Sequence, residues 1–301
     1  MKIPPYLKPG DTIGILCPAG FMPVEKAETA IHVFKEWGFN VVTGITLGRQ
    51  YNYFSGTDEE RLSDLQQMMD DPSINAIFCA RGGYGTGRII ERLEFKKFRK
   101  HPKWIIGFSD ITILHCHLFS NYGIASMHAP MASAFNDGQY NNEFVQSLHE
   151  GLAGKKGNFS AASHPFNKEG SAKGILVGGN LSLLAHLTGT SSEPNTSGRI
   201  LFIEDVGEYI YNIDRMLFQL KRAGKFENLA GLIVGGFTEM KDTEIPFGQS
   251  VEEVIKNIFR EYEYPVCYSF PVSHEKENYA LKIGMKYKLS VKKEKTSLKE
   301  L

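Results

Sequence analysis

The first half of the chain predicts an α/β fold built on a mainly parallel β-sheet. Two observations lead to this class. Short apolar runs rich in β-branched residues alternate with longer segments whose apolar residues recur at helical spacing. The strand-helix-strand order also leaves room for right-handed crossovers, which place helices on both faces of a parallel sheet.

The first expected strand is residues 12–17 (TIGILC), and Pro18 ends it. The helix that follows has apolar residues at helical spacing from Ala27 to Trp37, and Gly38 stops it. The same reasoning gives strands at 12–17, 40–42, 74–80, 104–108 and 124–128, and helices at 25–37, 58–70, 86–91 and 111–121.

Three loops should gather at one edge of this sheet, because ligands bind outside the carboxyl ends of parallel strands. They are residues 18–21, 81–85 and 108–110. The predicted N-terminal α/β domain covers residues 1–150. A stretch rich in Gly, Ser, Ala and Lys at 151–173 is predicted to be a linker. Residues 174–301 mix strands and helices less regularly and are predicted to form a second, C-terminal domain.

The composition excludes several classes of protein. The 301 residues include 34 basic and 34 acidic side chains, so the formal net charge is zero and gives no general attraction to nucleic acid or to an anionic membrane. No apolar run approaches the roughly 20 residues that span a bilayer, and the N-terminus MKIPP is no signal peptide. We therefore expect a soluble, cytoplasmic protein.

The four cysteines form no C-x-x-C pair, which favours buried, reduced thiols over a zinc site or a disulfide. His115 and His117 invite a metal-site interpretation with His128. Residues i and i+2 of a helix point to different sides, however, so we expect no metal.

Ser109 stands between an apolar strand and a helix. The segment Gly107-Phe108-Ser109-Asp110-Ile111 is similar to the G-x-S-x-G elbow that raises a nucleophilic serine above a sheet, although Ile111 replaces the second glycine. The alternative is a helix N-cap, a position at which serine is favoured. A serine at a helix N-terminus would also lie near backbone N–H groups that suit a developing oxyanion.

The segment Arg81-Gly82-Gly83-Tyr84-Gly85 has three glycines directly after a strand, which allows close backbone approach. It matches neither standard phosphate-binding spacing, so an oxyanion-hole donor or a plain tight turn is expected rather than a nucleotide site. Arg81 could pair with a substrate carboxylate or form a structural ion pair.

The second half supplies a carboxylate and an imidazole. Glu204 and Asp205 follow the apolar run 200–203, and His274 lies in a polar segment after another strand-like run. A serine needs a base, and that base needs a carboxylate to orient it. Ser109, His274 and Glu204 could fill these roles, but their spacing alone does not assemble a triad.

These motifs together resemble the LD-carboxypeptidases, a family of serine peptidases, over nearly the whole chain. The resemblance rests on the segments 10–15 (GDTIGI), 80–85 (ARGGYG), 107–112 (GFSDIT), 178–184 (GGNLSLL), 201–205 (LFIED) and 214–217 (DRML), and on His274, Asn278 and Gly284.

The resemblance implies a role for each matching residue. Ser109 would be the nucleophile, Glu204 the orienting acid and His274 the base. Backbone N–H groups of Asp110 and Gly83 would form the oxyanion hole. The implied fold pairs an N-terminal domain resembling class I glutamine amidotransferases with a smaller C-terminal domain containing a β-barrel, with the site between them. A homodimer without a cofactor is implied. Ser273 stands where many members of the family have glycine before the histidine.

The implied activity is hydrolysis of the amide before a terminal D-alanine of peptidoglycan tetrapeptides during cell-wall recycling. One alternative within the family is a microcin C-type immunity peptidase that cleaves aminoacyl-nucleotide conjugates. A second is a flavodoxin-like binding module without catalysis, which the lack of a phosphate loop disfavours. A cysteine glutaminase would need a cysteine where Ser109 stands, whereas Cys116 falls within the following helix.

Overall fold

The computed structural model describes residues 1–136, 138 and 140–301, which divide into two compact units. The first unit comprises Met1–Lys155 together with Tyr279–Lys282, and the second comprises Lys156–Asn278 together with Ile283–Leu301. The first unit is therefore discontinuous in sequence, since a short C-terminal segment returns to it.

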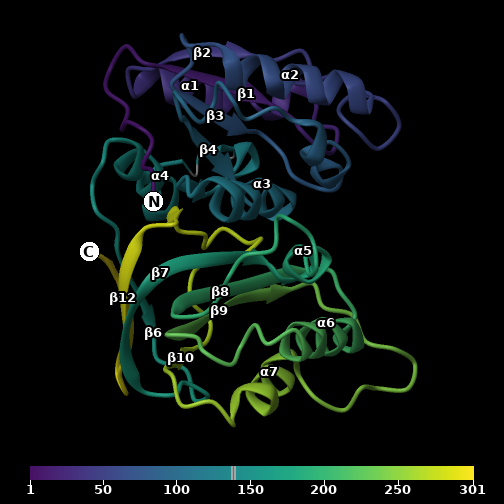
Figure 1. The fold of residues 1–301 in the computed structure, drawn as a ribbon, viewed down its shortest axis with the longest axis vertical. Coiled ribbons are helices and arrows are strands. Elements are labelled where there is room, and N and C mark those ends of the chain that lie inside the picture. Colours follow the sequence, from purple (N-terminus) through teal and green to yellow (C-terminus); the bar gives the residue numbers. More distant parts are fainter. Residues whose placement is uncertain (137, 139) are drawn as a thin grey trace. The chain divides into compact units, whose positions relative to one another are not determined.

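A six-stranded sheet forms the centre of the first unit (Figure 1). Its order is β11-β5-β4-β3-β1-β2, and every pair from β2 through β5 is parallel. The strands are β1 (Thr12–Leu16), β2 (Asn40–Thr43), β3 (Ala76–Cys79), β4 (Trp104–Gly107), β5 (Ser126–His128) and β11 (Leu281–Ile283). The predicted parallel sheet is confirmed, and the loops after β1, β3 and β4 leave it at the same edge.

The helices of this unit follow the expected order but not all of the expected types. The α-helices are α1 (Glu28–Glu36), α2 (Asp58–Asp70), α3 (Thr112–His117) and α4 (Glu143–Leu152). Short 3-10 turns are η1 (Val24–Lys26), η2 (Thr86–Arg88), η3 (Ile90–Arg92), η4 (Ser109–Ile111) and η6 (Ala132–Phe135), and η5 (Leu118–Tyr122) is a π turn.

Helix α2 has the bounds that the sequence predicts, because Thr57 and Glu60 form a reciprocal capping box at its start. The segment expected as one helix over 111–121 is instead three pieces, η4, α3 and η5. Its first piece, the 3-10 turn η4, begins at Ser109, and Gly123 follows its last piece with a left-handed φ of 59°.

The core of the first unit contains an aromatic cluster. Phe34 contacts Phe78 edge-on at 4.9 Å and Phe135 at 5.4 Å between ring centroids, and all three side chains are fully buried. Edge-to-face contacts of this kind add to the stabilisation from burial. The cluster joins α1, β3 and η6, so the helix layer is fixed to the sheet that carries the loops of interest.

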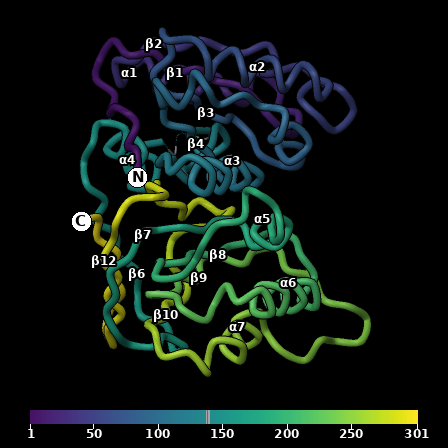
Figure 2. Tube along the Cα trace, viewed as in Figure 1, coloured from purple at the N-terminus to yellow at the C-terminus, as the bar shows by residue number. Residues whose placement is uncertain are grey.

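The second unit is built on a seven-stranded mixed sheet. Its order is β10-β9-β8-β7-β12-β13-β6, with parallel pairing from β10 to β7 and antiparallel pairing from β7 to β6. Figure 2 traces the yellow strand β12 beside the teal β7, its hydrogen-bonded neighbour. The strands are β6 (Asn158–Ala162), β7 (Gly170–Asn180), β8 (Arg199–Val206), β9 (Gly231–Thr238), β10 (Val266–Cys267), β12 (Lys286–Val291) and β13 (Lys295–Glu300).

This sheet does not confirm the expected β-barrel. Its order ends at β10 on one side and at β6 on the other, and the described strands form no closed ladder. An isolated bridge from Lys168 to Val266 shows that the sheet curls. The stretch 151–173, predicted as a linker, contains β6 and the first residues of β7.

Three helices complete the second unit: α5 (Leu181–His186), α6 (Ile210–Arg222) and α7 (Val251–Phe259). Ser250 and Glu253 form a capping box at the start of α7. Across the described parts of both units, none of the helices has the length and apolar character needed to cross a membrane.

Candidate active site

Ser109 occupies a strained turn at the end of β4. Its φ is 62°, a left-handed conformation that residues other than glycine rarely adopt. Ser109 is the first residue of η4, whose N-cap is Phe108, and no side chain caps that turn. The N-cap interpretation therefore does not describe this serine, whereas strain at a strand-to-helix turn is typical of a nucleophile elbow.

Gly107 explains why the elbow has glycine two residues before the serine. Its φ is 151°, and a Cβ added there would lie 3.0 Å from Cγ1 of Ile111 and 3.2 Å from Cβ of Cys79. Any side chain would push the turn away from β3 and from η4. The glycine therefore allows the chain to reverse directly beneath Ser109.

His115 supports the elbow from inside the protein. Its Nε2 donates to the carbonyl of Gly107 at 2.8 Å, and its Nδ1 lies 2.9 Å from the hydroxyl of Ser126. Burial lowers the pKa of His115 to about 4, so the imidazole is neutral at ordinary pH. Both nitrogens are thus used in structural hydrogen bonds rather than offered to a metal.

The glycine loop after β3 packs directly on the elbow. A Cβ added to Gly82 would lie 3.0 Å from Cβ of Ser109 and 3.1 Å from the backbone N of Asp110. The backbone N–H of Gly20 donates to the carbonyl of Gly82 at 3.0 Å, which connects the loop after β1 to the same place. The first unit therefore brings the three predicted loops together.

Gly83 and Arg81, the other predicted site residues of this loop, flank Gly82. Gly83 has a left-handed φ of 97°, and a Cβ there would lie 2.8 Å from the hydroxyl of Tyr53. The side chain of Arg81 passes Gly20, since a Cβ on that glycine would lie 3.3 Å from its Nε. Arg81 is exposed, as a residue that meets a ligand must be.

Glu204 and His274 form a hydrogen-bonded pair in the second unit. Nδ1 of His274 lies 2.6 Å from Oε2 of Glu204, whose side chain is fully buried in β8. A carboxylate oxygen can only accept, so Nδ1 carries the proton and Nε2 is the nitrogen able to take one from a substrate or a nucleophile. This is the orientation that a catalytic base requires.

The pair is electrostatically coupled. Burial alone would lower the pKa of His274, but the hydrogen bond and negative charge of Glu204, with the charges of Asp205 and Glu239, raise it above its ordinary value. Burial raises the pKa of Glu204 despite the opposing hydrogen bond from His274. Glu204 therefore stabilises the imidazolium form of His274.

Asp205, the neighbour of Glu204, has a structural role. Its carboxylate accepts hydrogen bonds from the side chain of Asn180 at 2.9 Å, from N–H and hydroxyl of Ser182 at 2.9 and 2.7 Å, and from N–H of Val206 at 2.8 Å. The three bonds from Asn180 and Ser182 attach the start of α5 to the end of β8, and the bond from Val206 lies within β8. They hold β8 still where Glu204 meets its histidine.

Ser273 closes the turn that carries His274. Its hydroxyl accepts from N–H of Glu275 at 3.0 Å and donates to the carbonyl of Glu277 at 3.1 Å. The side chain is buried, so serine fits where the family often has glycine. Gly235 permits the close approach of this segment to β9, since a Cβ there would lie 2.2 Å from the carbonyl oxygen of Val272.

The sequence interpretation missed the polar supports of these residues. Asn180 and Ser182 were noted only as part of a motif, and Arg61, which contacts the glycine loop, was not noted at all. A signal for Arg61 existed. It shares a helical face with Leu65, Met68 and Met69 of α2, which are buried. A cation on an apolar face indicates a buried polar partner.

The cysteines do not offer a competing nucleophile. All four are buried and unpaired thiols. Burial raises the pKa of Cys116 in α3 to about 12, so its reactive thiolate form is negligible at neutral pH. His186, the other histidine of residues 174–301, is exposed at the end of α5.

A serine on a strained elbow and a buried carboxylate–imidazole pair are the parts of a serine-type hydrolase on an α/β fold. Comparison with known proteins narrows this class. Residues 13–129 match the LD-carboxypeptidase N-terminal domain, and residues 173–289 match the LD-carboxypeptidase C-terminal domain. The chain belongs to the LD-carboxypeptidase family.

Individual relatives of the chain are also named as carboxypeptidases. A probable murein peptide carboxypeptidase of Bacillus subtilis is 37% identical, with 99% of this chain and 94% of the relative covered. A murein tetrapeptide carboxypeptidase of Pseudomonas aeruginosa is 30% identical, with 90% and 91% covered.

Solved structures share the whole fold. The muramoyltetrapeptide carboxypeptidase from Oxalobacter formigenes superimposes with a TM-score of 0.88 at 30% identity, covering 96% of this chain and 98% of that one. The microcin C7 self immunity protein MccF superimposes with a TM-score of 0.87 over 99% of this chain and 98% of that one, but at 22% identity. The second likeness is one of fold alone.

Proposed function

We propose that the protein is a serine LD-carboxypeptidase that removes the terminal D-alanine from peptidoglycan tetrapeptides. The observation that carries the proposal is the 2.6 Å hydrogen bond between buried Glu204 and His274, which prepares an imidazole as a base. The murein carboxypeptidase relatives at 37% and 30% identity supply the substrate class.

In this proposal Ser109 is the nucleophile and His274 the base. Nε2 of His274 takes the hydroxyl proton as the oxygen of Ser109 attacks the carbonyl carbon before the D-alanine. Glu204 stabilises the imidazolium that results. His274 then returns the proton to the leaving amine, and water hydrolyses the acyl-enzyme by the same steps in reverse.

Backbone N–H groups of Asp110 and Gly83 are proposed to stabilise the tetrahedral oxyanion. Contact between the loop at Gly82 and the backbone N of Asp110 supports this assignment, because it keeps the two donors in adjoining segments. Losing one such donor commonly costs about 10²–10³-fold in kcat.

Arg81 is proposed to bind the terminal carboxylate of the substrate. A guanidinium group can grip a carboxylate with two parallel hydrogen bonds, and Arg81 is exposed beside the glycine loop. Such an anchor would restrict cleavage to the last residue of a peptide. The proposal also takes from the family resemblance a cytoplasmic enzyme that acts as a homodimer.

The test is to incubate the protein with L-Ala-γ-D-Glu-meso-diaminopimelyl-D-Ala and to measure free D-alanine by mass spectrometry. We expect release by the wild type and at least a 10³-fold slower release by Ser109→Ala, because the acyl-enzyme cannot form. Ser133→Ala, in the short turn η6, is the matched control and should keep full activity.

Two outcomes would contradict the proposal. Equal release by the wild type and by Ser109→Ala would remove Ser109 as the nucleophile. No release by a folded wild type would remove the tetrapeptide as the substrate. An aminoacyl-nucleotide conjugate assayed in parallel would then show whether the protein acts as an immunity-type peptidase instead.

A further inference from the structure

A fully buried arginine reaches two of the three loops at the edge of the first sheet. Nη1 of Arg61 donates to the carbonyl of Pro18 at 2.7 Å and to the carbonyl of Gly85 at 3.0 Å. Its Nη2 forms an ion pair with Asp58, one turn earlier in α2, and its guanidinium lies over the ring of Phe54. Arg61 therefore joins the loop after β1 to the loop after β3.

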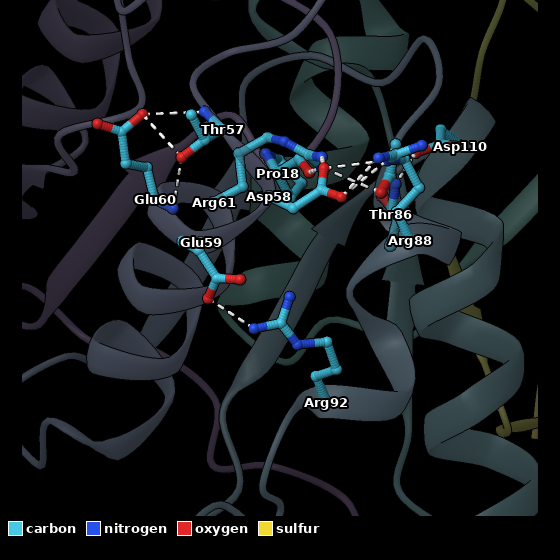
Figure 3. Close-up of polar contacts among 11 residues, drawn as sticks. Pro18, Thr57, Asp58, Glu59, Glu60, Arg61, Thr86, Arg88, Arg92 and Asp110 are labelled. Atoms are coloured by element: carbon cyan, nitrogen blue, oxygen red, sulfur yellow. Dashed lines mark hydrogen bonds and ion pairs between the residues drawn. The ribbon is translucent and has the colours of Figure 1, made fainter.

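The other side of the same loop is held by the residue that follows the nucleophile. The backbone N–H of Thr86 donates to Oδ2 of Asp110 at 2.8 Å, and the Asp110 side chain is buried. Figure 3 shows Arg61 and Asp110 converging from opposite sides on this region, with Pro18 and Thr86 between them. The peptide unit between Gly85 and Thr86 is thus gripped at both polar atoms.

The local packing around this peptide unit requires glycine at position 85. A Cβ added to Gly85, whose φ is 145°, would lie 2.8 Å from Nη1 of Arg61. Three residues earlier, Gly82 rests against Ser109 and the backbone N of Asp110. Only a short turn of chain therefore separates the hydrogen-bonded peptide unit Gly85–Thr86 from Gly82, which contacts the elbow.

We propose that Arg61 and the carboxylate of Asp110 are positioning residues that hold the 82–86 backbone against Ser109, so that both oxyanion donors stay correctly spaced. Neither side chain touches the substrate in this role. The inference rests on the proposed hydrolase function. It adds a positioning role for two side chains that belong neither to the nucleophile elbow motif nor to the Glu204–His274 pair.

Replacing Arg61 would not leave the carboxylate of Asp58 unpaired. Asp58 is also paired with Arg88, whose Nη2 lies 2.7 Å from Oδ2 and whose Nε lies 3.0 Å from both carboxylate oxygens. Removing Arg61 therefore leaves Asp58 with a cationic partner. The direct loss falls on the carbonyls of Pro18 and Gly85.

The test compares Arg61→Met with Arg92→Met in the full-length protein. Arg92 pairs with Glu59 of α2 at 2.5 Å and its side chain is half exposed. Among the described residues it forms no hydrogen bond to the glycine loop. We expect Arg61→Met to lower kcat for D-alanine release about 10- to 100-fold with KM within about twofold, as expected of a misplaced donor. Arg92→Met should stay within about twofold of the wild type.

A second pair of variants guards against a failure of Arg61→Met to fold. Asp110→Asn keeps an oxygen that can accept from Thr86, whereas Asp110→Ala removes it. We expect Asp110→Ala to lose kcat about 10- to 100-fold and Asp110→Asn to recover most of that loss. A merely structural role would lower the amount of folded protein without this split between kcat and KM.

Hydrogen exchange separates this inference from the proposed function. Amides in peptides covering residues 81–88 should exchange at least about tenfold faster in Arg61→Met and Asp110→Ala than in the wild type or in Arg92→Met. If the wild type released no D-alanine, the proposed function would fail, and the exchange rates would still decide whether the two side chains order the loop. Unchanged kcat, or unchanged exchange in both variants, would overturn the inference.

Discussion

At the scale of single residues, Glu204 governs when His274 can accept a proton. The imidazole works as a base only in its neutral form, and the buried carboxylate favours the charged form. The wild type should therefore gain activity as pH rises through a pKa above the ordinary histidine value. The same carboxylate makes the base stronger once it is neutral.

Changing Glu204 to Gln should lower the pH at which His274 loses its proton. Without the carboxylate, burial dominates and the pKa of His274 falls, so the acidic limb of kcat/KM shifts to lower pH. The maximal rate should fall by about 10⁴-fold, as for the comparable change in a serine protease triad, because an amide can hold the wrong tautomer. D-alanine release measured from about pH 5 to pH 9 checks both effects.

The matched control is Glu263→Gln, a carboxylate of the same unit that is 92% exposed and pairs with Lys168. It should leave the pH profile unchanged. An acidic limb that stays at its wild-type position in Glu204→Gln would contradict the assigned coupling. Stability should change with pH in the opposite direction to activity. Because the pKa of His274 is raised in the folded state, its protonated form stabilises the fold fully below the unfolded-state pKa, and this stabilisation is lost as pH rises through the folded-state pKa.

At the same scale, the sequence singled out the candidate catalytic residues but not the polar side chains that hydrogen-bond to their loops and strands. Ser109 could be singled out because glycine, serine and a following helix form a local pattern. Glu204 and His274 were paired through the family resemblance, since 70 residues separate them. The structural role of Asp205 could not be assigned, because Asn180 and Ser182 are far from it in sequence. For Arg61 the sequence places a cation on the buried face of a helix, but it does not identify the loop carbonyls of Pro18 and Gly85 that the side chain binds.

At the scale of elements, the glycine loop and the elbow behave as one backbone unit. Gly82 has no left-handed φ, so alanine is conformationally acceptable there, but its Cβ would lie 3.0 to 3.2 Å from Ser109, Asp110 and Phe108. The loop or the elbow must then shift by a few tenths of an ångström. What changes is therefore the spacing of the proposed oxyanion donors rather than the fold.

Gly82→Ala should lower kcat by about 10²-fold while the protein stays folded. Gly151→Ala is the control, because that glycine lies in α4 and its added Cβ would meet only flexible ends of side chains, 3.3 Å or more away. Steady-state kinetics beside thermal unfolding curves make the comparison. A Gly82→Ala enzyme with wild-type kcat would show that the loop tolerates displacement and does not contribute a donor.

The sequence predicted the boundaries of a helix correctly where a side-chain capping motif determines them. Helix α2 starts at its capping box, as predicted. The predicted helix over 111–121 is divided because the elbow imposes a 3-10 turn at its start and Gly123 ends it with a π turn. Both distortions arise from tight backbone geometry, which apolar periodicity does not report.

At the scale of the whole molecule, the strand β11 comes from the C-terminal part of the chain but pairs with the sheet of the first unit. Tyr279 donates to a carboxylate oxygen of Glu143 at 2.5 Å, Ala280 N–H donates to Ser147 at 2.8 Å, and Lys282 donates to the carbonyl of Lys155 at 2.9 Å. The sequence assigned all of 174–301 to one domain. A three-residue strand carries too little pattern to show that it pairs elsewhere.

A fragment of residues 1–155 should therefore be less stable than the complete first unit. It lacks β11, so β5 becomes an unprotected edge of the sheet. A synthetic peptide of residues 277–285 should raise its thermal midpoint in a concentration-dependent way, because it binds only the folded state. A scrambled peptide is the control, and equal midpoints with both peptides would contradict this role for β11.

The position of β11 also determines the order in which a newly made chain can be completed on the ribosome. Synthesis proceeds from the N-terminus, and domains commonly fold as soon as they emerge. Here the first sheet lacks its last strand until residue 283 has left the exit tunnel, when most of the second sheet is already outside. A premature stop codon anywhere before that residue therefore leaves both sheets unfinished, so no truncated product contains a complete first unit.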